Sequence, residues 1–106
     1  MGALLAHLAF WDRFVVERLM RWEKSGFDSS VVDADVINGA AIRGWRAIPG
    51  RAALHEALDA AEECDRRLER VADEIVTAIL AAGRHRMLDR SLHRDEHIRE
   101  VERLLA

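Results

Sequence analysis

The chain contains little that would support disulfide bonds, β-strands or a membrane span. Its single cysteine, Cys64, excludes an intramolecular disulfide framework and is typical of a reducing cytoplasm. There is one proline and no tyrosine, and β-branched residues cluster only between Val31 and Ile37, so strands have almost nothing to nucleate them. The longest apolar run, residues 3–11, is interrupted by His7 and is far shorter than the ~20 residues that a bilayer requires. The sequence therefore predicts a helical, cytoplasmic protein with no membrane segment.

Charge and length point to one ordinary globular domain. Sixteen Lys and Arg stand against nineteen Asp and Glu, a net charge of −3, which is too small an imbalance to favour non-specific binding to nucleic acids or membranes. Half of the residues are apolar and a third are charged, as in soluble globular proteins. We expect a single domain that covers residues 1–106 and binds no nucleic acid.

Apolar residues at three- and four-residue spacing predict a long first helix from near residue 3 to about 24, ended by Gly26. Ser30 to Asp33 has the form of a capping box that opens a shorter helix extending through Trp45, and Pro49 closes this segment. The apolar stripe of the first helix consists of Leu4, Leu8, Trp11, Val15, Leu19 and Trp22.

Two further helices are expected in the second half of the chain. The same spacing continues from about Arg51 for roughly seven turns, and Gly83 is the natural end of this helix. Ser91 or Asp89 can cap a final helix. The apolar stripe of the longer helix consists of Leu54, Leu58, Ala61, Leu68, Val71, Ile75 and Ile79, and that of the final helix of Ile98, Val101, Leu104 and Leu105.

These elements predict an all-α fold, an antiparallel bundle of three long helices and one short one. The segment from about residue 25 to 50 would cross over between the first two long helices. Because three long helices close a bundle poorly, we expect a fourth helix, from a partner chain or a swapped element, to cover the remaining apolar surface, and we therefore expect a homodimer.

Histidine spacing suggests a metal site. His93 and His97 lie four residues apart on the predicted final helix, so they share a face and are close enough to bind one ion. His7, at the edge of the first apolar stripe, is the best third ligand. Three neutral imidazoles with an open position suit Zn²⁺, Ni²⁺ or Fe²⁺. The alternative is that His93 is solvated and that His7 is a histidine at the edge of the core. We expect His55 and His85, which have no partner at ligand spacing, to be surface residues.

Other side chains are weaker candidates. Asp33, Asp35 and Asn38 could orient a ligand, although helix capping is the more common use of such residues. Acids that could act as a general base are Asp12, Glu96 and Glu100, but charged residues on helices are usually solvated. Three sets are assigned structural roles: Cys64 as a small buried residue, the basic run Arg84, Arg86, Arg90 and Arg94 as surface charge, and Trp11, Trp22 and Trp45 as core.

Several short segments, in their order and separation, resemble the DinB/YfiT superfamily across essentially the whole chain. They are 5–12 (LAHLAFWD), 35–38 (DVIN) and 93–98 (HRDEHI), followed by Val101. The chain is most similar to the branch of colibactin self-protection proteins and the N-terminal domains of mycothiol-dependent maleylpyruvate isomerases. Members of this family usually carry another long helix before the one with the first histidine, and that helix is absent from this sequence.

The resemblance implies a helical bundle with a three-histidine metal site, onto which His7, His93 and His97 map. It also implies thiol-transfer or hydrolytic chemistry, with a divalent metal ion and a low-molecular-weight thiol as cofactors. A second hypothesis treats the chain as a non-catalytic module that dimerises or binds a helix, because the bundle lacks a helix that relatives possess.

Overall fold

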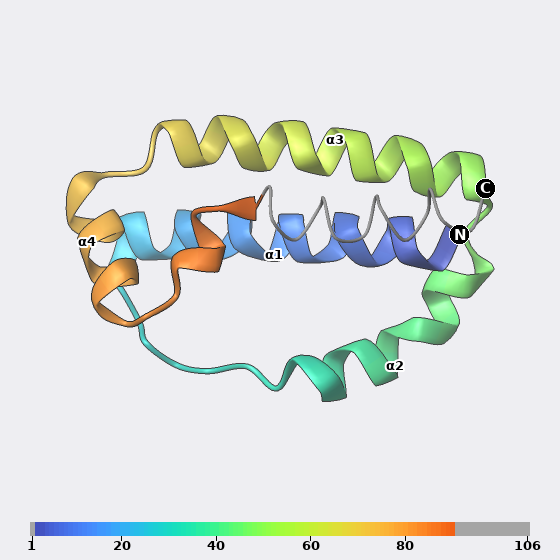
Figure 1. Ribbon diagram of the computed structural model, residues 1–106, viewed down its shortest axis with the longest axis horizontal. Coiled ribbons are helices and arrows are strands. Elements are labelled where there is room, and N and C mark those ends of the chain that lie inside the picture. Colours follow the sequence, from blue (N-terminus) through green and yellow to red (C-terminus); the bar gives the residue numbers. More distant parts are fainter. Residues whose placement is uncertain (1, 91–106) are drawn as a thin grey trace.

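The computed structural model describes residues 2–90, which form helices and the turns between them without any strand (Figure 1). The all-α prediction is therefore confirmed over this part of the chain. The final helix expected from Ser91 lies outside the described residues. The elements are α1 (Gly2–Ser25), α2 (Ala34–Ala47), α3 (Gly50–Glu69), α4 (Asp73–Ala81) and a single 3₁₀ turn, η1 (His85–Met87).

Two glycines end helices where the sequence predicts. Gly26 follows α1 with a φ of 89°, and its amide donates to the Trp22 carbonyl at 2.8 Å. Gly83 follows α4 with a φ of 72°. Its amide donates to the carbonyl of Leu80, and the next amide donates to that of Ile79, which is the paired hydrogen bonding of a Schellman motif. Both positions require the left-handed backbone that glycine adopts without strain.

The start of α2 differs from the prediction. Asp33, and not Ser30, is the capping residue, because its Oδ1 accepts a hydrogen bond from the amide of Val36 at 3.2 Å. Of the two roles considered for Asp33, orienting a ligand or capping a helix, the structure thus confirms capping. Ser30 belongs to the preceding turn instead. The helix ends at Ala47, just before Ile48 and Pro49, as expected for a residue forced out of helical geometry by a following proline.

The single helix predicted from Arg51 to Gly83 is wrong, because the structure breaks it into α3 and α4. The Arg70 amide folds back onto the carbonyls of Arg67 and Leu68, and Ala72 is extended with a ψ of 144°. Charges at the break suit two helix ends. Arginines occupy the last turn of α3, and Asp73 and Glu74 occupy the first turn of α4, each matching the sign that the helix dipole prefers.

The helices α1 and α3 lie side by side and run in the same direction (Figure 1). Two ion pairs fix this register: Arg13 with Glu56, and Glu23 with Arg67 at 3.5 Å. The prediction of a crossover between the first two long helices is confirmed, since the turn after α1 and α2 return the chain to the starting end. The predicted antiparallel arrangement, however, is wrong for α1 and α3. The crossover runs back along most of the length of α1 before α3 begins, so the two helices start at the same end of the molecule (Figure 1).

The interface between α1 and α3 is built on small side chains. Ala53, Ala60 and Cys64 of α3 are completely buried, whereas Leu54 and Leu58 are 45% and 60% exposed. The face of α3 that packs against α1 therefore differs from the predicted one. Its alanines point into the interface, and its leucines lie beside it. Small residues let two helix backbones approach closely. From this interface the hydrophobic core continues towards α4 as a cluster of buried residues: Val15, Val16, Leu19, Trp22, Cys64, Ile75 and Ile79. The role assigned to Cys64 is confirmed.

Two arginines, Arg18 of α1 and Arg84 of the turn after α4, hold the turn between α1 and α2. Arg18 donates through Nη2 to the Ser30 carbonyl at 2.8 Å and to its Oγ at 3.0 Å. Arg84 donates to the carbonyls of Ser29 and Ser30. Asp28 accepts from the amide and the hydroxyl of Ser30 at 2.9 and 3.1 Å. This turn is consequently attached both to the middle of α1 and to the turn that follows α4.

We expect the Asp28 turn to loosen in acid. Hydrogen bonds from the Ser30 backbone and side chain, aided by the charges of Arg18 and Arg84, lower the pKa of Asp28 below its ordinary value of 3.8. The stabilisation is therefore present above the unfolded-state pKa and is lost as pH falls through the folded-state pKa. The Ser30 amide signal in NMR spectra should shift over that acidic range in the wild type and stay constant in Asp28→Asn. A Ser30 signal that titrates equally in both proteins would contradict this assignment.

Candidate functional site

Of the three predicted metal ligands, His7 lies within the described part of the chain. It sits on α1, on the side that faces α2, and its ring meets the edge of the Trp45 ring with centroids 5.2 Å apart and an interplanar angle of 87°. His93 and His97 lie outside the described residues. Among residues 2–90, no group of three or more His, Cys, Asp or Glu side chains is placed to hold a metal ion. His55 and His85 are exposed, as predicted.

His7 lines two neighbouring hollows between α1 and α2. The first, which we call the His7 cavity, has a volume of about 250 Å³ and is lined by His7, Trp11, Ala34, Asn38, Arg86 and Arg90. The second, of about 440 Å³, is mostly apolar and is lined by Ala3, Leu4, His7, Asn38, Gly39, Ile42 and Trp45. Since His7 and Asn38 line both, a small molecule entering either hollow meets an imidazole and an amide.

A hydrogen bond across the His7 cavity orients Asn38. The indole Nε1 of Trp11 donates to Asn38 Oδ1 at 2.8 Å, which joins α1 to α2. The amide oxygen is occupied by this contact, so the NH₂ group is the donor that Asn38 offers to a ligand. The structure thus places Asn38 beside His7, in the lining of both hollows. This position is compatible with the role of orienting a ligand that the sequence suggests for Asn38. Asp35, suggested for the same role, is exposed in the first turn of α2.

The environment of Asp12 differs from the solvated position expected for a charged residue on a helix. Asp12 is 2% exposed, and its Oδ1 accepts from Nε of Arg90 at 3.0 Å, with the arginine side chain only 10% exposed. A signal was present in the sequence, because position 12 falls four residues after Leu8 and three before Val15, inside the buried stripe of α1. Asp12 is therefore a structural partner that docks the chain after α4 onto α1, five residues from His7.

The basic run after Gly83 also has intramolecular partners. Arg84 holds the turn at Ser29 and Ser30, and Arg90 holds Asp12. Arg86 is exposed and lines the His7 cavity. Two of these three arginines thus help to fix the fold around the cavity, and the fourth member of the run, Arg94, lies outside the described residues.

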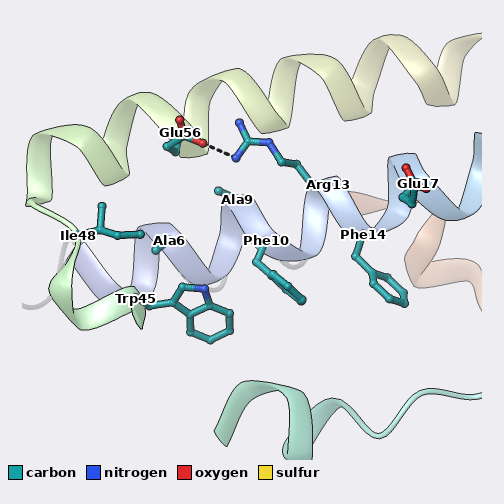
Figure 2. A pocket seen from close by; sticks show the side chains of 9 residues that line it. All are labelled: Ala6, Ala9, Phe10, Arg13, Phe14, Glu17, Trp45, Ile48 and Glu56. Carbon is teal, nitrogen blue, oxygen red and sulfur yellow. Dashed lines mark hydrogen bonds and ion pairs between the residues drawn. The ribbon is translucent and has the colours of Figure 1, made fainter. Parts of the chain in front are cut away.

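A separate groove lies between α1, the end of α2 and α3 (Figure 2). It has a volume of about 490 Å³, and the rings of Phe10, Phe14 and Trp45 project along one side of α1 while Arg13 and Glu56 pair on the other. The remaining acid on the rim, Glu17, pairs with Arg21 at 2.9 Å. Because these charges are matched and exposed, the groove offers apolar contacts but no evident group for acid–base chemistry or metal binding.

Comparisons with family models, with curated proteins and with solved structures find no match for this chain. The DinB/YfiT resemblance therefore remains a prediction from the quoted segments. The helices α1 to α4 do not combine the length and the apolar character needed to cross a bilayer.

Proposed function

We propose that this chain is a metal-binding helical protein of the DinB/YfiT type, in which His7, His93 and His97 hold one divalent cation. One open coordination position would let the metal polarise a substrate or lower the pKa of bound water or of a thiol cofactor. Thiol transfer or hydrolysis is the reaction class that we favour, with a low-molecular-weight thiol as the second cofactor.

The contact between Arg90 and Asp12 is the observation that supports this site. It places Arg90 on α1 and in the lining of the same cavity as His7. His93 follows three residues later, and covalent geometry limits three residues to at most ~11 Å between Cα atoms. The proposal therefore takes its other two ligands from the segment of the sequence that follows Arg90. Asn38 would support a metal-bound molecule from the other wall.

Metal content of protein purified without a polyhistidine tag tests the site. We expect about one equivalent of zinc, nickel or iron in the wild type, and little in His93→Ala/His97→Ala or in His7→Gln, since the proposed open site has only three protein ligands and each substitution leaves too few of them. His55→Ala is the matched control, because it removes an exposed imidazole that lines neither hollow. Equal, negligible metal in the wild type and the double variant would exclude the proposal, provided that circular dichroism shows both to be folded.

The exposed leucines of α3 favour the alternative function, a non-catalytic dimerising module. Leu54 and Leu58 are one turn apart and 45% and 60% exposed, which is a natural apolar contact for a second copy of the chain. Light scattering on the same preparations separates the two functions. A stable dimer without metal favours the module, and a monomer with bound metal favours the metal site.

A further inference from the structure

The larger of the two hollows that His7 lines, which we call the apolar hollow, has a wall that belongs to the hydrophobic core. Ala3 of α1 and Ile42 and Trp45 of α2 line it, and all three are also part of the core cluster around the buried Ala6. Because its wall is core, the hollow keeps its shape without a ligand. Its volume of about 440 Å³ lies within the range of ~300–1,000 Å³ that is typical of pockets for small molecules.

Two aromatic contacts hold the Trp45 ring in this wall. The ring of His7 meets its edge, and the ring of Phe10 packs against it with centroids 5.5 Å apart and an interplanar angle of 59°. Trp45 is only 7% exposed. Aromatic rings pack favourably against one another in offset and edge-on arrangements, so a fixed indole in the wall favours a ligand that itself carries a ring.

Asn38 adds one hydrogen-bond donor to this apolar surface. The indole N–H of Trp11 can only donate, so its contact at 2.8 Å fixes the Asn38 amide with the oxygen towards Trp11. The NH₂ group of Asn38 makes no hydrogen bond to any other group of residues 2–90. A carbonyl oxygen in the hollow would accept from this group, whereas a hydrocarbon would leave it unpaired.

We propose that the apolar hollow binds a small uncharged molecule with a ring and a carbonyl group, the ring lying against Trp45 and the oxygen accepting from the Asn38 NH₂. An uncharged ligand is favoured because a mostly apolar surface does not offset the cost of removing a charge from water. The inference goes beyond the proposed function, since α1 and α2 carry the binding and no metal ion is required.

Three probes that share a ring test the class of ligand. They are acetophenone, which has a carbonyl group, ethylbenzene, which lacks the oxygen, and benzoate, which is charged. In NMR titrations of isotope-labelled protein, we expect acetophenone to bind about fivefold more tightly than ethylbenzene, the gain expected from one hydrogen bond, and more tightly than benzoate. The indole N–H signal of Trp45 should shift on binding, and that of Trp22, in the other core cluster, should not.

Asn38→Asp tests the hydrogen bond. The substitution keeps an oxygen acceptor for the indole of Trp11 and removes the NH₂ donor. The preference for acetophenone over ethylbenzene should therefore disappear in this variant. Because both uncharged probes are compared in the same protein, a general loss of affinity or stability does not alter the ratio.

Two glycines of α2 provide matched variants that test the position of the ligand. Gly39 lines the apolar hollow and Gly44 is not among the residues that line it, yet both are exposed. An added Cβ at either position meets no atom of the described residues within 4 Å, so leucine fits at both and favours the helix equally. Gly39→Leu should weaken acetophenone by roughly tenfold, because ligand and side chain would overpack the hollow, and Gly44→Leu should leave its affinity unchanged.

Three results would overturn the inference. They are failure of acetophenone to bind the wild type, binding of ethylbenzene or benzoate as tightly as acetophenone, and equal affinity for acetophenone in Gly39→Leu and Gly44→Leu.

Discussion

Replacing Asp12 by asparagine should lower the free energy of unfolding by about 3 kcal/mol, because it leaves the Arg90 guanidinium charged in a site that is almost closed to water. Asparagine keeps the shape of the side chain and an oxygen acceptor, so the loss reports the charge rather than a cavity. Urea denaturation followed by circular dichroism measures it.

An exposed ion pair between α1 and α3 provides the matched control. Glu56 pairs with Arg13, but the two side chains are 51% and 43% exposed. Glu56→Gln should therefore cost at most about 1 kcal/mol. Arg90→Gln in the Asp12→Asn background should recover part of the loss, since it removes the buried charge that no longer faces a carboxylate at position 12. A loss for Asp12→Asn no larger than that for Glu56→Gln would show that Arg90 does not depend on this acid.

Truncation of Leu19 to alanine should cost about 3 kcal/mol, through lost burial and the cavity that remains. Leu19 is completely buried in the cluster that joins α1 to α3 and α4, with Trp22, Cys64 and Ile79 among its members. No neighbour can relax into the space without moving a helix, because the cluster is formed by three separate elements. Thermal or urea unfolding of the variant provides the measurement.

The same substitution at Leu58 is the control, because it removes the same atoms from an exposed position. Leu58 is 60% exposed on α3, and Leu58→Ala should alter stability by no more than about 0.5 kcal/mol. A cost at Leu58 that equals the cost at Leu19 and depends on protein concentration would show that a second copy covers α3, as the dimerising alternative requires. A cost below 1 kcal/mol at Leu19 would contradict the core described for this fold.

Helix ends were the most predictable part of the fold. Gly26, Pro49 and Gly83 end or separate helices where expected, because each imposes a special backbone geometry on its own. The capping box failed by three residues. Ser30 and Asp33 can both cap a helix, and which one does so depends on whether Arg18 from another element binds Ser30. That contact joins residues 12 positions apart in the sequence, so it leaves no local pattern.

Packing was less predictable than helix positions. Apolar spacing runs without interruption across Arg70, so the break between α3 and α4 is visible only in the switch from arginines to acids around it. Similarly, the leucine stripe of α3 resembles a core face, although alanines make the contact with α1. Hydrophobicity ranks leucine above alanine, whereas the close approach of two helices selects for small volume.

The candidate site was predictable in part. The sequence indicates His7 as a metal ligand and Asn38 as a weaker candidate for orienting a ligand, and the structure brings both to one cavity. The presence of Arg86 and Arg90 in the lining of this cavity could not be predicted from the sequence. It depends on the ion pair that docks Arg90 onto Asp12, and these two residues are 78 positions apart. The convergence of His93 and His97 on His7 stays a prediction, since both lie outside the described residues.

The shared direction of α1 and α3 has a consequence during synthesis on the ribosome. The partners in their two ion pairs are 43 and 44 positions apart, so the inner face of α1 emerges long before the helix that covers it. At about 5–20 residues per second, this delay is roughly two to nine seconds. Throughout that interval the nascent chain exposes the surface around Leu19 and Trp22, which is the kind of apolar surface that chaperones shield during synthesis.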